Sequence, residues 1–479
     1  MPTNHRPHKR RLDELACVYP NAAGLDIGSA EIVVAVPPER DAEPVRVFLT
    51  FTPDLYALVA WLLACGIDTV AMESTGVFWI PIYELLEQHG IVPYLVNARH
   101  VKTVPGRKTD WNDAQSLQKL HALGLLQPSF RPDAEIRTLR TLVRYRAELI
   151  ERRAPHINHM IQALKHMNIQ LNLVLTDVTG VTGLAMLRAM VAGERDPQRL
   201  AHFRQPGCKH SEAEIVKALT GTWDEAQLFV LRQAIDLFDY YTTKIGECDT
   251  KLEQQYQAME SRWEPNAPLP DLPPAKPDSK SKNALNFNAR AQIARVIGVD
   301  LVAVMGLSAV TVQTILSEIG TDMERFPTVK HFCSWLGLAP HNDISGGKVL
   351  RSRTMKVRNR ANQAFRQAAQ SVAKSDSSFG AYYRAMRARL GPKQAIVATA
   401  HKIARTVYQL LKTGEAYREE SAAEARLYPH GHTIDGTRVA ARRWLCRQFL
   451  SNAVLGCHAF PALHIVRACY GSGTGVHTT

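Results

Sequence analysis

Four acidic residues in the first quarter of the chain have the types and spacing of a metal-binding cluster. Asp110 and Asp113 stand three residues apart where helical periodicity begins, so both carboxylates should project from one face of a first turn. Asp26 and Glu73 each accompany an apolar, strand-like segment. Carboxylates held close together repel one another unless a cation lies between them, and hard oxygen ligands favour Mg²⁺. The predicted magnesium ligands are Asp26, Glu73, Asp110 and Asp113.

The segments around these acids predict a small α/β domain. Strand-like patterns begin at Gly24 and cover 31–36, 45–51, 67–72 and 91–96. Helical patterns cover 55–64, 80–89 and the run that starts at Asp110. The order β-β-β-α-β-α-β-α is that of a ribonuclease H-like domain, in which Glu73 would lie at the strand end where α/β sheets hold ligands. Each acid has a plainer alternative, because Asp commonly forms turns and Asp110 could be a helix N-cap.

The composition favours a polyanionic partner. The chain has 479 residues, 46 % of them hydrophobic, and its formal net charge is +13. A basic balance that serves only solubility is the alternative. Eight scattered cysteines without a C-x-x-C pair predict a reducing cytoplasm and argue against a zinc ribbon or a disulfide framework. Neither a secretory signal nor an apolar stretch long enough for a membrane span is expected.

The middle of the chain predicts a helical arm. Residues 134–164 form an arginine-rich amphipathic pattern that Pro155 should kink or break, and 224–262 form a second helical run, interrupted near Gly246. Two helices of this length suggest a coiled coil or bundle for dimerisation or for spanning a nucleic-acid backbone, although a packed helical domain fits equally. Six prolines within 264–288 then indicate a semi-rigid linker.

A basic region follows the linker and contains a candidate nucleophile. From Ile344 to Lys374 inclusive there is no acidic residue but there are eight basic ones, a pattern that suits a phosphodiester backbone. Ser345 stands beside Gly346 at the start of this run, where a hydroxyl would be sterically open to a phosphate, although Ser-Gly is also a common loop dipeptide. The predicted phosphate-binding residues are Lys348, Arg351, Arg353, Lys356, Arg358 and Arg360, with Arg107 and Lys108 beside the acids.

These motifs, in this order, resemble the IS110-family transposases, also called bridge-RNA-guided recombinases. The similar stretches are Gly24-Leu-Asp-Ile-Gly28, Met72-Glu-Ser-Thr-Gly76, Lys108-Thr-Asp-Trp-Asn-Asp-Ala114, Glu318 to Phe326, Trp335-Leu-Gly-Leu-Ala-Pro340 and Ser345-Gly346. The resemblance covers about residues 24–125 and 290–415. It implies a RuvC-like DEDD domain, a helical coiled-coil region and a mainly α C-terminal transposase domain with a serine nucleophile.

The resemblance also implies roles and boundaries. Asp26, Glu73, Asp110 and Asp113 would be the catalytic quartet, and Ser345 would attack DNA to form a covalent phosphoserine with Mg²⁺ assistance. A structured guide RNA would select donor and target DNA, and a homodimer or homotetramer would act in a bacterial or archaeal cytoplasm, associated with the nucleoid. The expected boundaries are 1–20 basic tail, 21–130 RuvC-like domain, 131–263 helical region, 264–289 linker, 290–415 transposase domain and 416–479 tail without an assigned role.

Two other functions fit parts of the pattern. A metal-dependent RuvC-like nuclease or junction resolvase would need the four carboxylates but not Ser345. A non-catalytic nucleic-acid-binding protein would need only the basic region.

Overall fold

The structure is a computed structural model in which the chain divides into two compact units, residues 1–133 and residues 134–479. The described residues are 16–73, 76–96, 110–263, 272, 283–354 and 359–419. The basic tail up to residue 15, most of the proline-rich segment and the tail from residue 420 therefore lie outside them.

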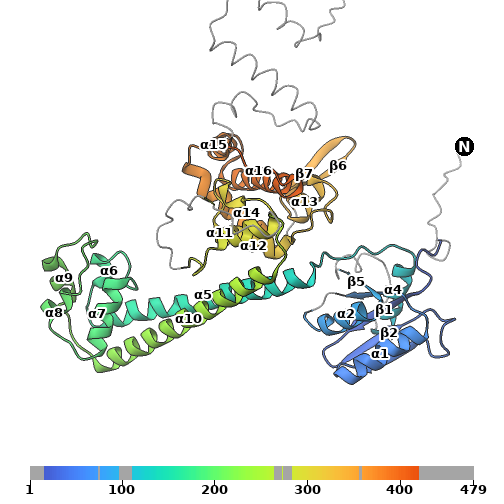
Figure 1. Cartoon of the computed structure of the whole chain (residues 1–479), viewed down its shortest axis with the longest axis horizontal. Helices are drawn as coiled ribbons and strands as arrows, with labels where there is room; N and C mark the ends of the chain where they lie inside the picture. The colour runs from blue at the N-terminus through green and yellow to red at the C-terminus, as the bar shows by residue number, and fades with distance from the viewer. Residues whose placement is uncertain are drawn as a thin grey trace, which may run out of the picture. The chain divides into compact units, whose positions relative to one another are not determined.

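A five-stranded mixed sheet forms the centre of the N-terminal unit (Figure 1). Its strand order is β3-β2-β1-β4-β5, with β1, β4 and β5 parallel and with β2 antiparallel to both of its neighbours. The strands are β1 (Ala22–Ile27), β2 (Glu31–Ala35), β3 (Val45–Leu49), β4 (Thr69–Glu73) and β5 (Val92–Val96). The strand and helix order predicted from the sequence is confirmed, and it is that of a ribonuclease H-like fold.

Helices cover the two faces of this sheet differently. On one face, α1 (Thr52–Ala64) and α2 (Trp79–Gln88) form the main apolar core with alternate strand residues such as Leu25 and Met72. On the other face lies α4 (Asp110–Ala122), whose Ala114 packs against the buried side chains of β2. Because side chains alternate along a strand, Gly24 and Asp26 belong to the face that α4 covers.

Two long helices lie side by side in the second unit and run in opposite directions (Figure 1). They are α5 (Ala134–His166) and α10 (Glu225–Ala258). At one end of the pair, short helices close around an apolar core that includes Met160, Met186 and Leu231. These short helices are α6 (Leu171–Val174), α7 (Val181–Val191), α8 (Pro197–Ala201) and α9 (Glu212–Leu219).

The long helices are continuous where the sequence suggested interruptions. Of the kink or break expected at Pro155, the break is absent, because α5 continues through this residue to His166. The expected interruption near Gly246 is also absent, because α10 is continuous. A glycine or proline inside a helix costs a few kcal/mol at most, and packing along an entire partner helix offsets that.

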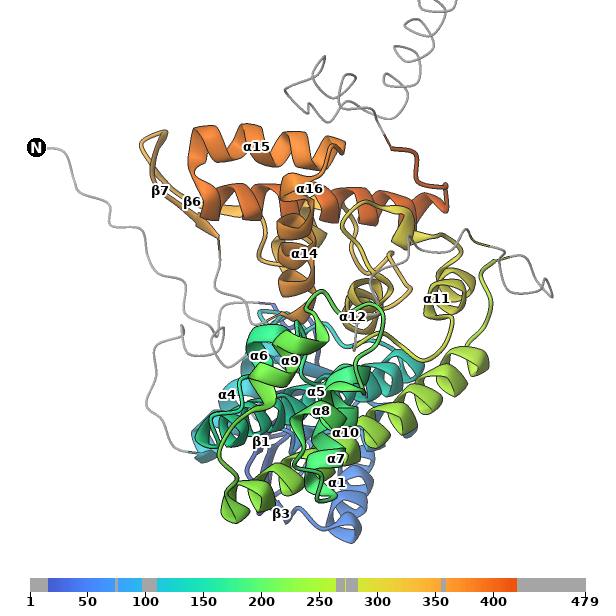
Figure 2. The same cartoon turned by 90° about the vertical axis from the view of Figure 1, so that its left-hand side faces the viewer.

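The remaining residues form a helical body with one projecting hairpin (Figure 2). The hairpin consists of β6 (Pro340–Ser345) and β7 (Lys348–Thr354), which pair only with each other. The helices are α11 (Ala289–Ile297), η2 (Leu301–Ala303), α12 (Ala309–Ile319), α13 (Val329–Trp335), α14 (Arg360–Ser371), η3 (Val372–Lys374), α15 (Ser378–Leu390) and α16 (Pro392–Thr413). α12 ends at Gly320, whose φ of 77° is one that glycine adopts more readily than other residues.

Arginines of α5 join the long helices to this helical body. Arg144 binds Glu318 of α12 through two parallel bonds of 2.9 Å, from Nε to Oε1 and from Nη2 to Oε2. Arg140 donates to the backbone carbonyls of Ser317 and Glu318, also at 2.9 Å. Arg146 is buried and paired with the buried Asp249 of α10. These three arginines therefore have acidic or carbonyl partners within the fold.

None of the helices in the described part of the chain combines the length and the apolar character that a bilayer crossing needs.

Candidate functional site

Asp26 and Glu73 are neighbours at the ends of two adjacent parallel strands. Leu25 of β1 pairs in register with Met72 of β4, so the next residues along, Asp26 and Glu73, stand side by side. Paired positions on neighbouring strands are roughly 4.8 Å apart. Both carboxylates lie on the face opposite the main core, and both residues are partly exposed. The sheet therefore brings together two of the four predicted acids.

Helix α4 runs antiparallel to β1 at very close range. Its Gln118 donates from Nε2 to the carbonyl of Ala22 at 3.2 Å, and Ala114 lies over Gly24 further along the strand. A Cβ on Gly24 would stand 2.3 Å from the Ala114 carbonyl oxygen, so no side chain fits there. Residues nearer the N-terminus of α4 therefore lie nearer the Asp26 end of β1. The first turn of α4, which contains Asp110 and Asp113, lies toward the same end of the sheet as Asp26 and Glu73.

The described residues supply part of the predicted metal site. Asp113 is partly exposed on α4, and Asp110 is the first residue of that helix, although its side chain lies outside what the structure describes. Among the described residues, no group of three or more His, Cys, Asp or Glu side chains is arranged to hold a metal ion. The structure therefore brings two carboxylates together, those of Asp26 and Glu73 at the strand ends, and their hard oxygens are the kind of ligand that a divalent cation takes.

The other end of α4 is fixed by a buried histidine. Thr69 of β4 gives its hydroxyl proton to the Val92 carbonyl, so His121 must donate from Nε2 to the Thr69 oxygen, 2.8 Å away. His121 is fully buried, and its Nδ1 has no hydrogen-bond partner among the described residues. Burial lowers the pKa of His121 to about 4. The neutral ring thus secures the helix that positions Asp110 and Asp113.

Ser345 is exposed at the tip of the β6–β7 hairpin. It is the last residue of β6 and pairs with Lys348, the first residue of β7. Gly346 and Gly347 between them have φ values of 54° and 75°, as the two central residues of a type I′ turn require. The sequence analysis did not predict this hairpin, although a Gly-Gly pair flanked by strand-forming residues could have indicated it. The turn holds the serine hydroxyl and the lysine close together in solvent.

The described members of the predicted phosphate-binding set lie on the hairpin and at the start of α14. Lys348, Arg353 and Arg360 are exposed. The backbone of Arg351 lies in β7, but its side chain is outside the described residues, as are Arg107, Lys108, Lys356 and Arg358. Residues 283–419 hold 20 Lys and Arg against eight Asp and Glu, a net charge of +12, which is nearly the charge of the whole chain. The hairpin therefore projects from the most basic part of the protein.

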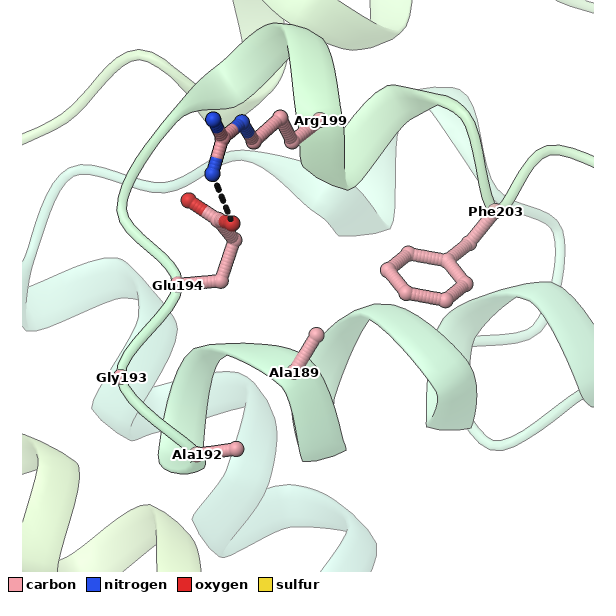
Figure 3. Close-up of a pocket in the computed structure, with 6 residues that line it drawn as sticks. All are labelled: Ala189, Ala192, Gly193, Glu194, Arg199 and Phe203. Carbon is pink, nitrogen blue, oxygen red and sulfur yellow. Dashed lines mark hydrogen bonds and ion pairs between the residues drawn. The ribbon is translucent and has the colours of Figure 1, made fainter.

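A surface pocket of about 520 Å³ lies at the end of α7, away from the predicted residues of its own unit (Figure 3). Its residues are Ala189, Ala192, Gly193, Glu194, Arg199 and Phe203. Arg199, its cationic group, already pairs with Glu194 at 3.5 Å and with Asp196 at 3.8 Å. The pocket therefore offers no uncompensated charge to an anion and none of the chemistry predicted from the sequence.

A ribonuclease H-like sheet with carboxylates at its strand ends defines the DEDD class of transposase domain. Residues 23–169 match the family model for the DEDD transposase of IS110 elements, and residues 299–384 match the model described as transposase, IS116/IS110/IS902 family. No curated protein matches the chain. The chain belongs to the IS110 family of transposases, as the resemblance indicated, and is an enzyme that acts on DNA. The DEDD domain also implies dependence on a divalent metal.

Proposed function

We propose that this transposase cuts and rejoins DNA through a covalent bond to Ser345, with a metal held by Asp26, Glu73, Asp110 and Asp113. The exposure of Ser345 beside Lys348 on a tight two-residue turn supports the proposal most directly. A nucleophile needs access to the phosphorus, and a neighbouring ammonium stabilises the charge that develops on the phosphate.

The serine step conserves the energy of the phosphodiester bond. Oγ of Ser345 forms a bond to phosphorus while the bond from phosphorus to the leaving deoxyribose oxygen breaks. The serine proton passes to a base, and the leaving oxygen takes up a proton. Rejoining reverses these events with the hydroxyl of the exchanged strand, so no high-energy cofactor is required.

The carboxylates would hold Mg²⁺, which when bound supplies a Lewis acid for the phosphoryl oxygens. The protein's own contribution is to position the four carboxylates. β1 and β4 place Asp26 beside Glu73, and the packing of α4 on Gly24 directs Asp110 and Asp113 toward the same end. Two carboxylates as neighbours favour a cation between them, because each raises the energy of the other.

The partners follow from the same chemistry. Donor and target DNA would lie along the basic surface of the hairpin and α14, and a structured guide RNA would select them. The acids and the serine belong to different compact units, so we propose a homodimer or homotetramer in which different copies complete each site. The cytoplasm, in contact with the nucleoid, is the proposed location.

Comparing Ser345→Ala with Asp26→Asn in strand cleavage tests the proposal. Both variants should lose cleavage, because the serine and the metal site act on the same phosphate. If Ser345→Ala cuts DNA at the wild-type rate while Asp26→Asn does not, the protein is a resolvase-type nuclease instead. RNA recovered with the purified chain and mapping beside its own gene would support guidance by RNA.

A further inference from the structure

β3 lies at the edge of the sheet and has apolar side chains that the described residues of its own unit leave exposed. β3 is the terminal strand of the sheet, and no other strand of the described residues pairs with its outer side. Val47 and Leu49 are 44 % and 48 % exposed, and Phe51, directly after the strand, is 68 % exposed. Alternate apolar residues of this kind are typical of a strand with one buried face. Here Val45 packs against the small core of β2 and α4, whereas Val47 and Leu49 on the same face are exposed.

The backbone of β3 has free hydrogen-bonding groups at the same positions. Val36 donates to the carbonyl of Pro44, and Thr50 donates to that of Ala30, so the even-numbered residues of β3 bond to β2. The N–H and C=O groups of Val45, Val47 and Leu49 therefore point away from the sheet. A further strand could pair with all three residues.

The opposite edge of the sheet, β5, is blocked against pairing with a further strand, whereas β3 is not. β5 contains Pro93, and its Leu95 carbonyl accepts a hydrogen bond from the backbone N–H of Ser129. Prolines and covering loops are the usual means of preventing edge-to-edge association. In β3 the one charged residue is Arg46, which stacks on Trp61 of α1 on the other face and pairs with Asp41 at 3.0 Å. Arg46 is therefore not placed to prevent another strand from pairing with β3.

We propose that β3 pairs antiparallel with β3 of a second copy, about a two-fold axis through Val47. The strand is self-complementary under this operation. Val47 meets its own copy, Val45 meets Leu49, and all three are positions whose backbone groups point outward. Such an isologous contact closes into a dimer and unites the two sheets. That the chain forms an oligomer is part of the proposed function, and the inference added here is that β3 forms the interface.

Substitutions at Val47 test this interface in the full-length chain, stripped of nucleic acid at high salt and measured by sedimentation equilibrium. In Val47→Lys, two ammonium groups would meet at the two-fold axis, and we expect the dimer dissociation constant to rise by about tenfold or more. Val92→Lys is the matched control, since Val92 is 55 % exposed on the opposite edge strand and should leave the constant unchanged.

Mixing two variants excludes a general effect on folding. Val47→Glu alone should also weaken the dimer, whereas an equal mixture of Val47→Lys and Val47→Glu copies should restore it, because opposite charges then meet at the axis. A wild-type dimer that is unaffected by Val47→Lys would overturn this surface and leave the proposed oligomer intact. A wild-type chain that is monomeric at every concentration would overturn both. DNA adduct formation by Ser345 is measured separately and does not depend on either result.

Discussion

Gly24 of β1 and Ala114 of α4 are in such close contact that a Cβ at position 24 would lie 2.3 Å from the Ala114 carbonyl oxygen. Two residues after Gly24 comes Asp26, and one residue before Ala114 comes Asp113. This contact is therefore the structural reason that the helix with two of the predicted acids lies near the strand with a third.

Gly24→Ala should push α4 away from β1. We expect it to lower the free energy of unfolding by about 1–3 kcal/mol, the usual effect of overpacking, and to weaken divalent-metal binding. Gly207→Ala is a suitable control, because no atom lies within 4 Å of a Cβ built there. Denaturant unfolding and calorimetric Mn²⁺ titration measure the two effects. Unchanged metal affinity in a destabilised Gly24→Ala chain would contradict the positioning role.

Glu73→Gln should reduce divalent-metal affinity by roughly tenfold or more, because it removes a charged ligand beside Asp26. Glu31→Gln provides the comparison, since Glu31 is an exposed carboxylate on the neighbouring β2. Calorimetric titration with Mg²⁺ and Mn²⁺ measures both variants. Equal affinities would show that the ends of β1 and β4 do not hold the metal.

The buried His121 predicts a loss of stability in mild acid. Burial lowers the pKa of His121 to about 4, whereas an unfolded histidine titrates near 6.5, so the unfolded chain binds a proton that the folded chain excludes. The stabilisation is complete above about pH 6.5 and falls toward pH 4, by about 3 kcal/mol at most. His121→Gln should flatten this part of the pH profile of the thermal midpoint. An equally steep profile in the variant would assign the acid sensitivity to other groups.

Basic residues of the hairpin and basic residues of α5 should differ in their effect on DNA binding. Lys348→Ala should lower the slope of log affinity against log salt by about one, as expected for one lost phosphate contact. Arg144→Ala should leave that slope unchanged. It should instead destabilise the chain by about 2 kcal/mol, because the buried Glu318 carboxylate loses its two bonds from Arg144. Salt titrations of affinity distinguish these outcomes. A reduced slope for Arg144→Ala would show that α5 contacts the backbone of DNA.

The sequence predicted the sheet well because its strands show alternating or continuous apolar runs, and because Gly28 and Pro37 mark the ends of the first two. The contact between Gly24 and Ala114 could not be predicted from the sequence, because the two residues are far apart in the chain and only the fold brings them together. Local pattern also suggested a break at Pro155 and an interruption near Gly246, but packing between α5 and α10 keeps both helices continuous through these residues. The arginines of α5 look like a nucleic-acid surface in sequence, and only the structure shows Glu318 and Asp249 as their partners.

Peptide mass spectrometry of the chain trapped on a cleaved DNA substrate identifies the residue that bonds to phosphorus. After nuclease digestion, we expect a nucleotide on the peptide that contains Ser345, in the wild-type chain and not in Ser345→Ala. Cleaved DNA with no protein adduct, or a nucleotide attached to another residue, would contradict it.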